Sequence, residues 1–213
     1  MSNAILSRSK FIHIPKCGGT AIQSALWYIG CVKDKSQMFT DATYPGFGHL
    51  FASQMPEDDR SNFTFIRNPI TWWNSFYHWN MRQKLSRFNG AELKTKSFDE
   101  WVNDYGQFWL GLYTRLVTRY AGEDTDFPTS NKVQYWGKTE YLFRDLKTIL
   151  DAAEEEYDVA KMNTLITRPD SVSFINKNEQ LYPRQASDST KDIIYLTEKP
   201  IFDRFGYSTE VYN

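Results

Sequence analysis

The chain has 213 residues, and its 25 Lys and Arg nearly balance its 26 Asp and Glu. This length is enough for one domain with a substantial core, whereas the balanced charge excludes a global electrostatic signature for nucleic acid or an anionic membrane. The sequence has no apolar run that could cross a bilayer and no secretory signal, so we expect no membrane span. Its two cysteines form neither a disulfide framework nor a zinc site, and we expect a cytoplasmic protein.

Periodic patterns predict strands that alternate with helices. Residues 1–10 are expected to form a flexible N-terminus, followed by a buried strand at 11–14 and a helix at 20–29. Residues 33–59 are rich in turn-forming residues and suit a loop over a site. A second strand at 63–66 leads into a long helix from Pro69 to about Phe88, since proline is well tolerated at a helix start.

The second half of the chain continues this alternation. Ser97 and Glu100 fit a capping box before a helix. The remaining predicted elements are a helix at 108–120, a strand at 133–136, a helix at 139–153, a strand at 172–175 and a last helix from 191 that Pro200 interrupts. We therefore expect an α/β fold in a single domain over residues 1–213, with a central, mostly parallel sheet flanked by helices. Most of the many aromatic residues are expected to pack in its core.

The segment after the first strand has the features of a phosphate-binding turn. Gly18 and Gly19 let main-chain N–H groups approach an anion, Lys16 adds a positive charge, and the following helix adds its unpaired donors and positive dipole end. The spacing is not that of an ATP- or GTP-hydrolysing P-loop, because the lysine precedes the glycines and the first glycine of that motif is missing. The predicted phosphate contacts are Pro15, Lys16, Cys17, Gly18, Gly19, Thr20 and Ala21.

A second anion site is predicted after the next strand. Arg67 follows that strand directly and can bind a phosphate with two parallel hydrogen bonds, and Ser75 can add a hydroxyl donor. In such sheets ligands bind at the carboxyl ends of the strands. Two phosphate sites after two strands indicate a ligand that carries phosphates at two positions.

These segments resemble the phosphate-binding motifs of sulfotransferases that use 3′-phosphoadenosine 5′-phosphosulfate (PAPS). The first resembles the 5′-phosphosulfate loop, often His-Ile-Pro-Lys-Thr-Gly-Gly-Thr, and differs in having Cys17. The second resembles the 3′-phosphate motif, a strand followed by Val-Arg-Asp/Asn-Pro and a later serine, although Trp72 stands where related sequences often carry arginine. The resemblance implies a P-loop-like nucleotide-binding fold of the sulfotransferase type.

Later segments extend the resemblance to about residue 207. Residues 137–145 resemble the family's Gly-x-x-Glu-x-Leu-x-x-Asp element, Lys177 lies in a segment similar to the loop that closes on the nucleotide, and residues 202–207 resemble its terminal Asp-x-x-x-Phe-Gly-Tyr. The resemblance is closest to the carbohydrate branch, which includes chondroitin and heparan sulfate enzymes. It implies PAPS as co-substrate, its desulfated product PAP as a partner, a hydroxyl-bearing carbohydrate acceptor, and no metal.

The implied reaction moves a sulfuryl group nearly in line to an acceptor oxygen, so negative charge builds up on the leaving phosphate. Lys16 is the residue expected to stabilise this charge. The attacking hydroxyl needs a base that titrates near neutral pH. His49 is the candidate, because related carbohydrate enzymes use a histidine on the loop between the two motifs. The loop acids Glu57, Asp58 and Asp59 are the alternatives.

Two other functions stay open from the sequence. A small-molecule kinase would bind ATP with magnesium through a standard P-loop, which this sequence lacks. A non-catalytic nucleotide-binding domain would keep both phosphate sites without the base. Transfer of a sulfuryl group to an acceptor distinguishes the predicted enzyme from both.

Overall fold

A computed structural model describes residues 3–39, 50–82, 97–105, 111–122, 132–169 and 186–210. The chain divides into two compact units, one made of Met1–Arg67 and Leu116–Lys177, the other of Asn68–Arg115 and Asn178–Asn213. The first contains a sheet with helices, so the expected α/β class is confirmed. The expectation of a single domain over residues 1–213 stays a prediction. Within the described ranges, no helix is long and apolar enough to cross a membrane.

Among the residues that the structure describes, the first unit contains a sheet of five short strands. They are β1 (Asn3–Ile5), β2 (Ser9–Ile12), β3 (Met38–Phe39), β4 (Ser61–Ile66) and β5 (Tyr135–Lys138), in the order β3-β1-β2-β4-β5. β4 pairs in parallel with β2 and β5, whereas β1 is antiparallel to β2 and to β3. Only β1 therefore runs against the others, and the sheet is mixed and mostly parallel, as expected.

β1 is the main difference from the predicted elements. The sequence predicts a flexible stretch over residues 1–10, but Asn3–Ile5 are buried and pair with strands on both sides. The Asn3 side chain is satisfied by distant residues: its Nδ2 donates to the Leu50 carbonyl over 2.7 Å, and its Oδ1 accepts the N–H of His13 over 3.2 Å. The prediction is wrong here because a three-residue strand that begins with asparagine shows no hydrophobic period.

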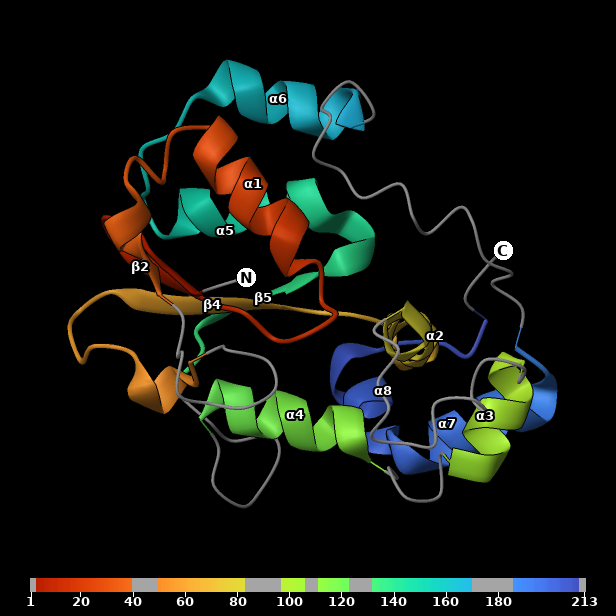
Figure 1. Cartoon of the computed structure of the whole chain (residues 1–213). Coiled ribbons are helices and arrows are strands. Elements are labelled where there is room, and N and C mark those ends of the chain that lie inside the picture. Colours follow the sequence, from red (N-terminus) through yellow and green to blue (C-terminus); the bar gives the residue numbers. More distant parts are fainter. Residues whose placement is uncertain are drawn as a thin grey trace. The chain divides into compact units, whose positions relative to one another are not determined.

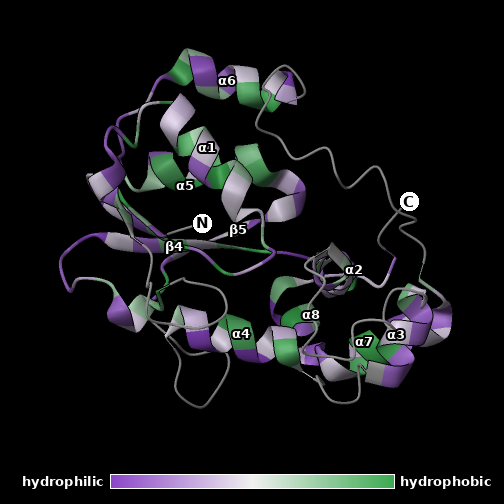
Figure 2. Cartoon of the chain, in the orientation of Figure 1, coloured by the Kyte–Doolittle hydropathy of each residue, from purple (hydrophilic) through white to green (hydrophobic). Residues whose placement is uncertain are grey.

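Helices α1 (Gly19–Tyr28), α5 (Leu142–Ala152) and α6 (Val159–Thr167) lie on one side of this sheet (Figure 1). The helix expected at 20–29 is confirmed as α1, which buries Ile22 and Leu26. α6 is absent from the predicted elements. It alternates hydrophilic and hydrophobic residues (Figure 2) and buries only Met162 and Leu165, so its apolar stripe is narrow.

The second unit is helical in its described part. It contains α2 (Pro69–Arg82), α3 (Phe98–Tyr105), the first turn of α4 (Leu112–Ala121), α7 (Asp188–Thr197) and α8 (Lys199–Phe205). Its core is aromatic, as expected from the composition. Trp72 is fully buried and stacks on Phe76 and Tyr113, with ring centroids 5.1 and 4.6 Å apart. Trp101 packs against Trp73 with centroids 5.8 Å apart.

Several predicted elements are confirmed with small shifts. In the capping box of α3, the Ser97 N–H donates to Glu100 Oε2 over 2.7 Å, and the Glu100 N–H donates to Ser97 Oγ over 3.3 Å. The strand predicted at 133–136 is β5, two residues later, and a 3₁₀ turn precedes α5. The last predicted helix is interrupted, as expected, with the break at Glu198 and Pro200 in the first turn of α8. The strand predicted at 172–175 and the end of the long helix beyond residue 82 lie outside the described residues.

Candidate functional site

The turn between β2 and α1 contains two residues in the left-handed backbone region. Lys16 has a φ of 67° and Gly18 a φ of 75°. Glycine adopts this conformation readily, but for a residue such as lysine it costs about 1–2 kcal/mol. Between them, the Cys17 N–H donates to the carbonyl of Ile14 over 3.3 Å and closes the turn. Turns of this kind direct successive N–H groups toward one point, where an anion can bind.

Each glycine of the turn has a neighbour that excludes a side chain. A Cβ at Gly19 would lie 1.9 Å from His13 Nε2, and a Cβ at Gly18 would lie 2.9 Å from Leu142 Cδ1 and 3.3 Å from Thr139 Cγ2. The turn is therefore held by His13 from the end of β2 and by residues at the start of α5. Only a bare backbone fits at both positions.

The N-terminus of α1 has neither a side-chain cap at Gly18 nor an acidic residue in its first turn. α3 and α7 differ, because Ser97 and Ser187 accept N–H groups of their own first turns over 3.3 Å. A helix N-terminus without its own acceptor or acid suits an external anion.

The predicted phosphate contacts around this turn differ in exposure. Pro15 and Cys17 are buried, Lys16 and Ala21 are half-buried, and Thr20 is exposed. Cys17 is 1% exposed, so its thiol is a small packing group at the position where threonine is commonest in the family it resembles. Of the contacts that reach the surface, Lys16 and Thr20 are thus the ones with polar side chains.

Arg67 follows β4 at the same edge of the sheet. β2, β4 and β5 are parallel, so their carboxyl ends meet at one edge, where ligands bind in sheets of this kind. Arg67 is half-buried there. Thr139, directly after β5, donates its hydroxyl to the Ile66 carbonyl over 2.7 Å and ties the ends of β4 and β5 together. Two cations, Lys16 and Arg67, therefore follow neighbouring strands at this edge.

The segment at 137–145 supports this edge. A Cβ at Gly137 would lie 2.4 Å from Phe65 Cε1, so the ring of β4 needs glycine opposite it. The N–H of Lys138 donates to Asp145 Oδ2 over 2.7 Å, which fixes the turn from β5 into α5. Glu140 is exposed. The glycine and the aspartate of this motif therefore act on the fold, next to the candidate site.

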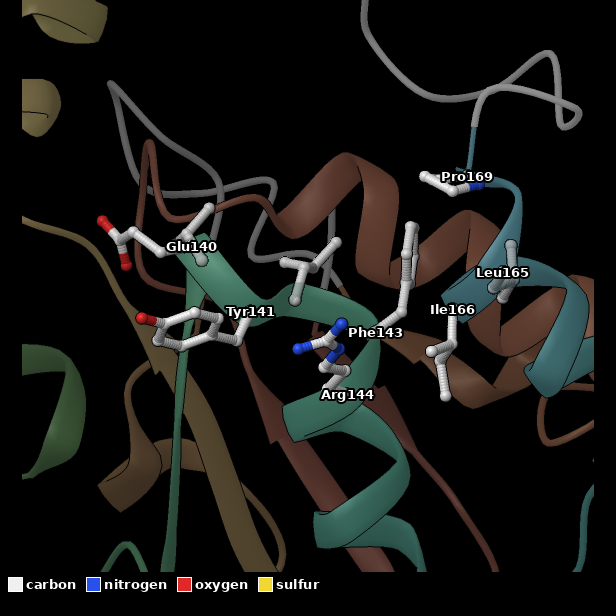
Figure 3. A pocket seen from close by; sticks show the side chains of 9 residues that line it. Glu140, Tyr141, Phe143, Arg144, Leu165, Ile166 and Pro169 are labelled. Carbon is white, nitrogen blue, oxygen red and sulfur yellow. The ribbon is translucent and has the colours of Figure 1, made fainter. Parts of the chain in front are cut away.

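A hollow of about 400 Å³ lies at the start of α5 (Figure 3). Thr139, Glu140, Tyr141, Leu142, Phe143, Arg144, Leu165, Ile166 and Pro169 line it. Its volume is in the range of small-molecule sites. Thr139 and Leu142 also stand against Gly18, so the hollow adjoins the phosphate-binding turn. Tyr141 is 57% exposed, which is unusual for a large aromatic side chain.

Ser75 belongs to the second unit, where it is half-buried on α2. This helix is capped by Asn68, whose Oδ1 accepts the N–H of Ile70 over 2.9 Å. Trp72 stands where the motif that this segment resembles often has arginine. It is a core residue and packs against aromatic rings. The joint role of Arg67 and Ser75 at one phosphate stays a prediction.

The predicted base and the closing lysine, His49 and Lys177, lie outside the described residues, and their roles stay predictions. Asp58, one of the alternative acids, accepts hydrogen bonds from Arg60 Nη2 over 2.6 Å and from Lys10 Nζ over 3.0 Å. The hydrogen bond from Arg60 holds the pKa of Asp58 well below its usual range. Asp58 also precedes β4, at the opposite edge from the turn. It is therefore a structural residue and an unsuitable base.

His13 and Leu142 hold the turn; both lie in segments that carry the resemblance, but neither is among the predicted site residues. Gly19 is the signal that could have revealed His13. Gly19 is the first residue of α1 and does not have a positive φ, so its backbone conformation does not require glycine. A glycine at this position therefore indicates that there is no space for a side chain. The side chain that takes this space cannot be identified from the spacing alone.

Comparisons of the chain with protein-family models, with curated proteins and with solved structures find no match. The resemblance to PAPS-dependent sulfotransferases therefore rests on the residues of the two motifs and of the supporting segments. The function that follows from it is a proposal.

Proposed function

We propose that the chain is a PAPS-dependent sulfotransferase that transfers a sulfuryl group to a hydroxyl of a carbohydrate acceptor. One observation carries the proposal: the turn with Lys16, Gly18 and Gly19 and the cation Arg67 follow neighbouring parallel strands at the carboxyl edge of the sheet. PAPS carries its sulfonate on a 5′-phosphate and has a second phosphate at the 3′ position. Two anion sites on one edge match these two groups.

Lys16 has the central role in the proposed reaction. Negative charge builds up on the 5′-phosphate as the sulfonate leaves, and a fixed cation next to that phosphate lowers the barrier. The left-handed backbone at Lys16 supports this role, because strained residues of this kind cluster at functional sites. Gly18, Gly19 and the start of α1 bind the same phosphate through main-chain N–H groups. Arg67 binds the 3′-phosphate.

The hollow at the start of α5 supports a nucleotide rather than a bare phosphate. It adjoins Gly18 and combines an apolar part, from Phe143 and Ile166, with the charged Arg144 (Figure 3). Such a surface suits a planar ring next to a phosphate. The acceptor hydroxyl is deprotonated by His49, and Lys177 closes over the nucleotide.

Transfer of radiolabelled sulfonate from PAPS to a mixture of carbohydrate acceptors tests this function. We expect transfer by the wild type, loss of transfer in Lys16→Ala, and normal transfer in Lys35→Ala, which removes an exposed lysine of the same unit. Tight binding of PAPS without transfer to any acceptor would identify a non-catalytic nucleotide-binding domain. Magnesium-dependent turnover of ATP would identify a kinase.

Two further variants separate binding from chemistry. His49→Ala should lower kcat strongly and leave the affinity for PAP nearly unchanged, because a base acts on the acceptor and not on the nucleotide. Arg67→Ala should instead weaken PAP binding by at least about tenfold, since it removes a charge-assisted phosphate contact. Unchanged turnover in His49→Ala removes His49 from the mechanism, and unchanged affinity in Arg67→Ala removes Arg67 from the nucleotide site.

A further inference from the structure

His13 is a buried side chain beside the proposed phosphate site, and the proposed reaction gives it no task. It is 2% exposed, and its ring stacks on Phe11 with centroids 5.8 Å apart and an interplanar angle of 19°. Its backbone N–H donates to Asn3 Oδ1 over 3.2 Å. Asn3 is fixed in turn by its bond to the Leu50 carbonyl. The place of the imidazole is thus set by two strands, β1 and β2.

The imidazole occupies the space above the first residue of α1. A Cβ at Gly19 would lie 1.9, 2.2 and 2.3 Å from Nε2, Cδ2 and Cε1 of His13. Three ring atoms at such distances mean that the ring itself, and not the end of a flexible chain, stands against the glycine backbone. His13 and Gly19 are therefore a matched pair, in which a ring from the strand packs on the bare backbone of the helix start.

We propose that His13 is a positioning residue that fixes the N-terminus of α1 for the 5′-phosphate. The inference rests on the proposed function, because that function provides the phosphate. Leu142 and Thr139 hold Gly18, so His13 completes a clamp on two successive residues of the turn. Donors that are already in place when the anion arrives bind it more tightly than donors that must first be ordered. His13 acts through Gly19 and does not touch the ligand.

Two nucleotides isolate this effect in binding measurements by calorimetry. Adenosine 3′,5′-bisphosphate and adenosine 3′-monophosphate differ only in the 5′-phosphate, so the ratio of their Kd values reports the 5′ site alone. We expect His13→Ala to reduce this ratio by about tenfold, as for other small displacements in a preorganised site. The affinity for the 3′-monophosphate should stay unchanged. His13→Phe keeps a planar ring against Gly19 and should restore most of the ratio.

The matched pair gives a second measurement. Gly19→Ala alone should abolish the 5′-phosphate contribution, because its Cβ collides with the ring. In the His13→Ala background the same substitution has room, so the double variant should bind the bisphosphate more tightly than Gly19→Ala does. If the double variant binds no better, the ring does not set the position of Gly19 and the inference is wrong.

The outcomes distinguish the inference from the proposed function. If the wild type binds both nucleotides equally, no 5′-phosphate site exists, and the proposed function and the role of His13 are both overturned. If the wild type favours the bisphosphate and His13→Ala keeps that preference, the nucleotide site stands and only the role of His13 is overturned. If His13→Ala loses the same factor in affinity for both nucleotides, in proportion to its lower stability, His13 is a residue of the core. This result also overturns its positioning role.

Discussion

Each of the two units of this chain holds a carboxylate by hydrogen bonds, one with charged donors and the other with neutral donors. In the first unit, Asp58 is held by two cations. It accepts hydrogen bonds from Arg60 and from Lys10, whose side chain is 4% exposed. The pairing with Arg60 holds the pKa of Asp58 well below its usual value of 3.8. This carboxylate is charged over most of the pH range and fixes the segment before β4 to β2.

In the second unit, Glu198 is fully buried and is held by neutral donors. It accepts hydrogen bonds from the Trp73 indole N–H over 3.0 Å, from the Tyr113 and Thr114 backbone N–H groups over 3.0 and 2.7 Å, and from the Thr114 hydroxyl over 2.6 Å. Burial outweighs these four bonds and raises the pKa of Glu198 above its usual 4.5. Its charge is therefore less favoured than that of Asp58.

A related contrast applies to the N-termini of two helices, α4 and α1. Tyr113 and Thr114 stand in the first turn of α4, so Glu198 is an anion of the chain itself bound at a helix start. The first turn of α4 thus has a carboxylate of the chain itself, whereas the first turn of α1 has neither an acid nor a side-chain cap at Gly18, an arrangement that suits an external anion.

Loss of the cation-paired carboxylate should have the largest effect on stability. Asp58→Asn removes the negative charge opposite Lys10, whose buried ammonium group then has neutral acceptors such as the Pro56 carbonyl. Breaking a pair with a buried member in this way costs about 3 kcal/mol of unfolding free energy, which urea denaturation can measure. Glu154→Gln is the matched control, because the Arg8–Glu154 pair is exposed on both sides and should cost less than about 1 kcal/mol. Equal losses in both variants would contradict the burial argument.

Loss of the Glu198 carboxylate should lower the free energy of unfolding somewhat less than loss of the Asp58 carboxylate. Glu198→Gln keeps the shape of the side chain but replaces one acceptor oxygen by an NH₂ group that faces N–H donors, and we expect a loss of about 2 kcal/mol in the same urea experiment. Asp192→Asn, an exposed acid on α7, should stay within about 0.5 kcal/mol of the wild type. A stability of Glu198→Gln equal to that of the control would mean that the four hydrogen bonds do not hold the start of α4.

The contributions of Asp58 and Glu198 to the free energy of unfolding should also change with pH in opposite directions. The pKa of Asp58 is lowered in the folded state, so its stabilisation is present above pH 3.8 and is lost as the pH falls through the folded-state pKa. The pKa of Glu198 is raised, so its contribution is most favourable below pH 4.5 and is lost as the pH rises through the folded-state pKa.

Unfolding free energies of the wild type, Asp58→Asn and Glu198→Gln across this range test the signs. The free energy of unfolding of Asp58→Asn should fall less than that of the wild type as the pH is lowered below 3.8. That of Glu198→Gln should fall less than that of the wild type as the pH rises from 4.5. Parallel curves for the three proteins would show that neither group couples folding to pH.

The features that could be predicted from the sequence depend on residues close together in the chain. The turn at Gly18, the helix at 20–29 and the capping box of Ser97 and Glu100 each follow from a few neighbouring residues. The contacts that complete the site and the core are remote. Glu198 lies 85 residues after Tyr113, and a buried glutamate on a helical pattern gives no sign of its partners. The same limit applies to β1, whose pairing partners the sequence pattern does not identify.

The smallest effects on stability are expected at the starts of α3 and α1. The chain caps the first of these helices with Ser97, whereas the second is the proposed phosphate site. Ser97→Ala removes the cap of α3 and should cost about 1 kcal/mol of unfolding free energy, with no change in the affinity for PAP. Thr20→Ala, in the exposed first turn of α1, should change stability by less than about 0.5 kcal/mol and weaken PAP binding. If Thr20→Ala costs stability and leaves binding unchanged, the start of α1 is an ordinary capped helix end. The contrast with α3 and α4 would then disappear, and with it the main structural reason to place a phosphate at Gly18 and Gly19.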